Sequence, residues 1–318
     1  IVALGCLFQG LTQLFCDFVR VSGKPILGMC VTSIGAVTNI LLDALFVAVL
    51  DWGVTGAAWA TVIGQILSAL FGAYLVMKGH TKVEIQRDTF RFDGALSKKI
   101  ISCGFAFWIA QMAMGLISLV YNSQLGKYGG DTAISVYAVV ASIMTFVIMP
   151  ASGISQGIQP IVGNNYGAGK YRRVMSTLYQ ASAFSVGITC VIWLLVLFFP
   201  KAILMAFGAS EEMLELGVSG LRINFCITPI LGFVMLVTTF FQSLTKPIPS
   251  ILITFLRQIF FLIPFIYLFP MIWDISGIFM AQPVSDALAL LVCIFFVARE
   301  RRLLYRKLPE GCRDIKGV

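Results

Sequence analysis

Long apolar runs separated by short polar stretches dominate this chain of 318 residues. Each run holds about 20 or more mostly apolar residues, the length that an α-helix needs to cross roughly 30 Å of hydrocarbon. The runs lack strict alternation of polar and apolar positions, which excludes the strands of a β-barrel. The pattern predicts nine membrane-spanning helices, at approximately residues 1–19, 25–49, 54–77, 98–124, 131–162, 170–199, 212–241, 247–271 and 276–298.

Composition and charge support an integral membrane protein and predict its orientation. Charged residues make up only 12% of the chain, about half the share typical of soluble domains. If the predicted helices alternate in direction, 19 of the 23 Lys and Arg fall on one side, which the positive-inside rule assigns to the cytoplasm. The net charge of +8 therefore reports orientation in the cell membrane, and we expect no nucleic-acid partner.

One long polar segment, residues 78–97, divides the apolar runs and contains the only histidine, His80. We interpret it as a cytoplasmic linker between two helical bundles. The predicted domains are a remnant of a first bundle at 1–77, the linker, and a second bundle of six helices at 98–318 that ends in a basic cytoplasmic tail.

Two parts of the chain read as divergent copies of each other, with chance recurrence of turn residues as the alternative. Residues 20–25 and 242–247 both end in Lys-Pro before an apolar run, and the turns at 52–56 and 273–277 also match. The offset is about 222 residues, as expected for the internal repeat of a two-lobed transporter. The three helices before the linker match the last three of the chain. We therefore expect three further helices before residue 1, which makes this chain nine helices of a monomeric, pseudo-symmetric bundle of twelve.

Four oxygen-bearing side chains lie in one predicted layer of the first bundle. Asn39 and Asp43 are four residues apart and share a helix face, and Thr61 and Gln65 do the same on the next, antiparallel helix. Oxygen ligands suit a hard cation, and a desolvated aspartate can carry a proton. We predict a coupling site for H⁺ or Na⁺, with no catalytic residue and no other cofactor. The alternative is that Asp43 reaches toward the interface while the others help the helices to pack.

The second bundle does not repeat this set. The positions that match the first pair are Phe261 and Phe265, and the second pair is matched by Gln282 and Asp286. Because the halves are chemically unequal, we assign coupling to the first. Asp286 is expected to form a structural ion pair with Arg257 on the preceding helix.

The second bundle also carries flexible and aromatic side chains that suit varied substrates. The candidates for a cavity that takes small, drug-like organic compounds are Gln111, Met112, Met144 and Asp286. Several others share this character, and packing or lipid contact is the alternative for each: Phe105, Phe107, Trp108, Met114 and Tyr121.

Residues 150–173 read PASGISQGIQPIVGNNYGAGKYRR. This segment resembles the eighth-helix signature of the multidrug and toxic compound extrusion (MATE) transporters, and residues 39–43 and 53–61 resemble their fifth and sixth helices. The resemblance implies two lobes of six helices, of which this chain holds helices four to twelve, and export of organic, often cationic, compounds in exchange for H⁺ or Na⁺. Gly153 and Gly157 also form a GxxxG face, which predicts a close helix approach.

The resemblance also implies which residues bind the cation. In family members of the prokaryotic type the site uses an Asp on helix one, an Asn and an Asp on helix five, and a Thr on helix six. Asn39, Asp43 and Thr61 match the last three, and the helix-one Asp is expected before residue 1. The seventh and tenth helices offer no acid here, which argues against a second-lobe cation site.

Two other functions compete with this one. A lipid-linked saccharide flippase of the same superfamily is the alternative, and it would be expected to have a strongly cationic cavity. An intramembrane enzyme would need His, Cys or paired acids clustered at one depth, and the sequence offers no such cluster.

Overall fold

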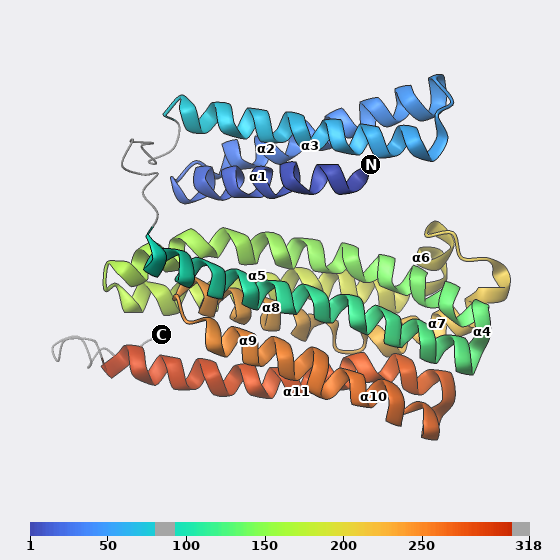
Figure 1. Cartoon of the computed structure of the whole chain (residues 1–318). Coiled ribbons are helices and arrows are strands. Elements are labelled where there is room, and N and C mark those ends of the chain that lie inside the picture. Colours follow the sequence, from blue (N-terminus) through green and yellow to red (C-terminus); the bar gives the residue numbers. More distant parts are fainter. Residues whose placement is uncertain (80–92, 307–318) are drawn as a thin grey trace. The chain divides into compact units, whose positions relative to one another are not determined.

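The computed structural model describes residues 1–79 and 93–306, and every regular element in them is a helix. The chain forms two compact units, Ile1–Asp93 and Gly94–Val318, coloured from blue to red in Figure 1. The predicted all-α membrane fold is confirmed. The elements are α1 (Val2–Val21), α2 (Pro25–Asp43), η1 (Ala44–Val49), α3 (Gly53–Met77), α4 (Gly94–Gly167), α5 (Tyr171–Phe198), α6 (Pro200–Ala206), η3 (Glu211–Met213), α7 (Leu214–Phe225), α8 (Thr228–Ser243), α9 (Pro247–Phe255), η4 (Leu256–Leu262), α10 (Ile263–Leu268) and α11 (Pro270–Arg306).

The predicted spans correspond to these helices. In residues 1–79 and 93–306, seven helices are long and apolar enough to cross a membrane, and an eighth span results if α7 and α8, which meet at an angle of 47°, are taken together. One of the seven, Gln111–Gly167 within α4, consists of two helices joined at Gly130, where φ is 61° and ψ is −159°. Within the described residues, each of the nine predicted runs therefore lies on helix.

The first unit is a bundle in which α1, α2 and α3 all contact one another. Two glycines let α2 and α3 approach closely. A Cβ added at Gly64 would lie 2.8 Å from the carbonyl oxygen of Gly35, and one added at Gly35 would lie 2.2 Å from the Ser68 Oγ. These contacts leave no room for a larger side chain. The backbones of α2 and α3 therefore lie in direct contact along a glycine seam made by Gly35 and Gly64.

The second unit contains two hydrophobic clusters. One gathers residues of both halves of α4 with α7, α10 and α11, and the other joins α4, α5, α8, α9 and α11. Large side chains that are less than 2% exposed fill both clusters, among them Tyr121, Phe225, Phe240, Phe241 and Phe279. This core positions the helices that carry the polar residues of the second unit.

The repeated Lys-Pro segments share one backbone conformation. Lys24 precedes α2 with φ −117° and ψ 62°, and Lys246 precedes α9 with φ −113° and ψ 78°. The residue before each lysine has a positive φ, 86° at Gly23 and 56° at Thr245. Each proline then occupies the first helical turn, where its missing N–H has no helical partner to lose.

Both helices that follow these prolines contain a π-helical segment. In the first unit η1 begins directly after Asp43, and the N–H of Leu50 bonds to the carbonyl of Leu45, five residues earlier, at 2.9 Å. In the second unit η4 follows α9. Such wide turns are rare and occur frequently at functional sites, and nothing in the hydrophobic pattern predicted them.

Three predictions need comment here. Most of the segment 78–97, including His80, and the tail 307–318 lie outside the described residues, and α4 begins at Gly94 rather than at 98. The close approach predicted for the GxxxG face is wrong for the part of the chain that the structure describes, because a Cβ added at Gly153 or Gly157 would meet no atom within 4 Å.

Candidate functional site

Two residues of the polar layer predicted for the first unit meet between α2 and α3. The Asn39 Nδ2 donates a hydrogen bond of 3.4 Å to the Thr61 Oγ1, which in turn donates to the Ala57 carbonyl at 2.9 Å. The glycine seam described above brings the two helices close enough for this contact, since Gly64 also packs against the Asn39 backbone. The structure thus brings together two of the four predicted side chains by a direct bond.

The other two side chains each bury an oxygen. The Asp43 Oδ1 and the Gln65 Oε1 are shielded from solvent, and neither has a hydrogen-bond partner among the described residues. A buried acceptor without a partner is costly, so such atoms in a native structure call for a water, an ion or a proton. Asp43 stands at the end of α2, directly before the π-helical segment.

The first helix contributes to this layer, which the sequence analysis missed. The Gln65 Nε2 donates to the Gln9 Oε1 at 3.5 Å, and the Thr12 Oγ1 donates to the Gln65 carbonyl at 3.4 Å. Gly5 leaves room for the amide of Gln65, because a Cβ there would lie 2.1 Å from the Gln65 Oε1. Positions 5, 9 and 12 recur at helical spacing, and that stripe of small and polar residues was the available signal.

The chemistry of this layer follows from its atoms. All of its candidate ligands are oxygens, from one carboxylate, two amides and one hydroxyl, which fit Na⁺ as a transported ion. A proton on the Asp43 carboxyl would instead turn an unpaired acceptor into a donor. Either Na⁺ or a proton would give the buried Asp43 Oδ1 a partner. The arrangement therefore suits exchange of a small cation.

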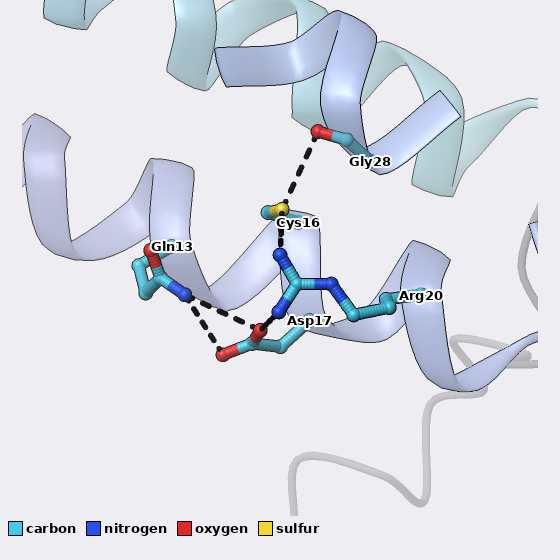
Figure 2. Close-up of polar contacts among 5 residues, drawn as sticks. All are labelled: Gln13, Cys16, Asp17, Arg20 and Gly28. Atoms are coloured by element: carbon cyan, nitrogen blue, oxygen red, sulfur yellow. Dashed lines mark hydrogen bonds and ion pairs between the residues drawn. The ribbon is translucent and has the colours of Figure 1, made fainter. Parts of the chain in front are cut away.

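A second polar cluster joins the end of α1 to the start of α2 (Figure 2). The Arg20 Nη1 contacts the Asp17 Oδ1 at 3.2 Å, and the Gln13 Nε2 donates to both oxygens of Asp17 at 3.3 Å. The Arg20 Nη2 donates to the Cys16 Sγ, which donates to the Gly28 carbonyl at 3.4 Å. Asp17 was not singled out from the sequence. Its partners, Gln13 and Arg20, lie one turn to either side on its own helix, so Asp17 belongs to a local polar cluster of α1.

In the second unit the buried acid Asp286 forms an ion pair. The Arg257 Nη1 lies 2.9 Å from the Asp286 Oδ1, and the Gln282 Nε2 donates to both oxygens of Asp286 at 3.2 Å. Ser285 further donates to the Arg257 carbonyl. The predicted structural pairing of Asp286 with Arg257 is confirmed, so both oxygens of this acid already have partners.

Within the described residues no hydrogen bond or ion pair joins the predicted substrate-cavity residues to one another, and their role in a cavity stays a prediction. Gln111 and Met112 are exposed on α4, Met144 packs against the core, and Asp286 is buried. Tyr121 stacks on Tyr137 with ring centroids 4.5 Å apart and is 1% exposed, so it is a core residue. The side chains of Phe105 and Phe107 lie outside the described set.

Comparisons with known proteins agree with this architecture. The multidrug export protein MepA of Staphylococcus aureus (strain MSSA476) is 23% identical over 282 residues, which cover 88% of this chain and 62% of MepA. The chain therefore spans less than two thirds of the length of the curated relatives it matches. A solved structure of MATE in the bent conformation matches the fold with a TM-score of 0.87 at 21% identity, over 95% of this chain and 68% of that one.

A more similar solved structure is that of the MATE multidrug transporter DinF-BH in a ligand complex. It is 32% identical, with a TM-score of 0.85, and the match covers 95% of this chain and 68% of DinF-BH. The sequence model of the MatE family matches residues 107–268, just over half of the chain. The match to the family model and the DinF-BH match together show that this chain belongs to the MatE family of transporters.

Proposed function

We propose that the protein is a secondary multidrug exporter that moves organic, often cationic, compounds out of the cell in exchange for H⁺ or Na⁺. The observation that carries the proposal is the buried Asp43 Oδ1, without a partner among the described residues, one helical turn after the Asn39 that bonds to Thr61. Membership of the MatE family and the names of MepA and DinF-BH as multidrug transporters support it.

The proposal assigns coupling to the first unit and excludes an enzymatic role. Asp43 accepts the cation, and Asn39, Thr61 and Gln65 supply further oxygens. A carboxylate that binds the ion when the drug is released outside, and loses the ion inside when the next drug molecule binds, gives exchange without any covalent step. The protein acts as a monomer in the cell membrane, with the segment 78–97 and the C-terminus in the cytoplasm.

The flippase alternative is not supported by the described residues. Such a protein would use free buried cations to hold an anionic lipid-linked sugar. Here Arg257 is neutralised by Asp286, and Arg222 is exposed on α7. No specific observation favours that function.

The proposal is tested by Asp43→Asn in the protein as the cell makes it. We expect ethidium efflux to fall to the background of cells without the transporter, while the amount of protein in the membrane is unchanged. Asp17→Asn is the matched control, because the partners of that acid lie on its own helix α1, and this variant should leave efflux near wild type. Undiminished efflux in Asp43→Asn would refute the assignment.

The coupling ion is read from the same assay. Efflux that depends on Na⁺ at constant pH indicates sodium exchange, and efflux driven by a pH gradient in the absence of Na⁺ indicates proton exchange. Asp43→Asn should abolish the response to whichever ion drives the wild type.

A further inference from the structure

A groove of about 590 Å³ lies within the second unit, between α5, α8 and α11. It is separate from the polar layer of the first unit and from the Arg257–Asp286 pair. Its walls are Tyr179 from α5, Phe233 from α8, and one face of the C-terminal part of α11. These helices belong to one compact unit and contact one another, so the groove is a feature of the fold itself.

The lining changes character along α11. Ile294, Val297 and Ala298 make an apolar wall with Phe233, and the groove then reaches Arg301, Arg302 and Tyr305. At 1.5 Å per residue, the step from Ile294 to Arg302 is about 12 Å. A membrane helix that passes from apolar residues to a row of arginines marks the boundary between hydrocarbon and water. The groove therefore runs from the acyl region into the headgroup region.

The positive charge at the headgroup end is available to a ligand. The nearest acid along the helix, Glu300, is 5% exposed and is held by Lys246 at the start of α9. Within the described part of the chain, no carboxylate pairs with Arg301 or Arg302. The Arg301 guanidinium lies over the Tyr305 ring, 5.6 Å from its centroid, which holds it at the mouth of the groove.

We propose that this groove binds an anionic phospholipid of the surrounding membrane. An acyl chain lies along the apolar wall, and the phosphate accepts hydrogen bonds from Arg301 and Arg302, whose guanidinium groups suit phosphate geometry. Basic pockets between membrane helices are known to hold anionic headgroups. Two arginines without a carboxylate partner among the described residues would repel an organic cation, which separates this site from the path of the exported compounds. A soluble phosphate ester has no acyl chain to pack against the apolar wall, so it should bind much more weakly than a phospholipid.

The experiment is native mass spectrometry of the protein purified in detergent, titrated with phosphatidylglycerol or with phosphatidylcholine. The variants are Arg301→Gln with Arg302→Gln, which removes the charges, and Ala298→Trp, which fills the apolar part. Arg299→Gln is the matched control, because this exposed arginine is on the same helix but does not line the groove. Glycerol 3-phosphate serves as a soluble competitor without acyl chains.

We expect wild type and Arg299→Gln to retain phosphatidylglycerol in preference to phosphatidylcholine. The double arginine variant should bind it about 25-fold more weakly, since each basic residue near an anionic headgroup contributes roughly fivefold. Ala298→Trp should lose it as well, and glycerol 3-phosphate should not displace it. The proposal is overturned if the double variant binds as tightly as Arg299→Gln, if both lipids bind equally, or if glycerol 3-phosphate displaces the lipid.

Discussion

Removal of one charge from the buried ion pair of the second unit should destabilise the protein severely. The side chains of Arg257 and Asp286 are 14% and 6% exposed, and their charged atoms lie 2.9 Å apart. Asp286→Asn keeps the size of the side chain but leaves the guanidinium buried without its counter-charge. Loss of one partner from a buried pair costs about 3–5 kcal/mol, because the remaining charge stays desolvated.

Two further variants isolate the cause. Asp17→Asn breaks the Arg20–Asp17 pair, in which the acid is 48% exposed, and should cost at most about 1 kcal/mol. Replacement of both buried partners, by Arg257→Met with Asp286→Leu, removes the unpaired charge and should restore stability to within about 1 kcal/mol of wild type or better.

The assay is equilibrium unfolding in mixed micelles with sodium dodecyl sulfate as denaturant, followed by tryptophan fluorescence. The expected order of stability is wild type near the apolar double variant, then Asp17→Asn, then Asp286→Asn well below. The reasoning is refuted if Asp286→Asn and Asp17→Asn lose the same amount, or if the apolar double variant is no more stable than Asp286→Asn.

Two further predictions concern packing and use the same unfolding assay. Gly64→Ala should lower the free energy of unfolding by about 1–3 kcal/mol, because the new Cβ would lie 2.8 Å from the Gly35 carbonyl oxygen. The control Gly187→Ala meets nothing within 4 Å and should be neutral or slightly stabilising. Equal effects of the two variants would contradict the close α2–α3 seam. Phe279→Ala, at a side chain that is 1% exposed, should lower the free energy of unfolding by about 3–5 kcal/mol. Phe295→Ala, at a side chain that is 62% exposed, should change it by less than about 0.5 kcal/mol. A similar loss in both variants would contradict the assigned core.

The sequence predicts the helices of this protein well because the membrane requires long apolar segments whose backbone bonds are satisfied internally. It also predicts which polar residues of α2 and α3 share a layer, since Asn39 and Thr61 follow from helical spacing and antiparallel depth. The Arg257–Asp286 pair follows from the same argument, because a charge in hydrocarbon needs a partner.

What the sequence does not predict depends on contacts between helices. Gln9 reaches Gln65 only because α1 packs on α3 at Gly5, and no local pattern gives that angle. The GxxxG face of Gly153 and Gly157 misled for the same reason, since small residues permit close approach but do not supply the partner helix.

The two π-helical segments have a consequence for how the halves of the chain are compared. A bond from residue i to i+5 accommodates one residue more than the α-helical turn it replaces. In the first unit η1 begins at Ala44, late after Pro25, whereas η4 begins at Leu256, soon after Pro247. At the depth of Asn39 and Asp43, the helix after Pro247 has therefore already passed its extra residue, whereas the helix after Pro25 has not. Positions matched by counting from the prolines then no longer face the same direction.

This one-residue difference changes which residues of the second half correspond to Asn39 and Asp43. Counting gives Phe261 and Phe265, but a correction of one residue gives Leu262 and Ile266. These two are 2% and 0% exposed, which is the inward direction expected of true counterparts. The second half therefore keeps aliphatic side chains at the rotational positions where the first half keeps Asn39 and Asp43, the residues proposed to bind the cation. An attempt to install a second coupling site by mutation should begin at Leu262 and Ile266.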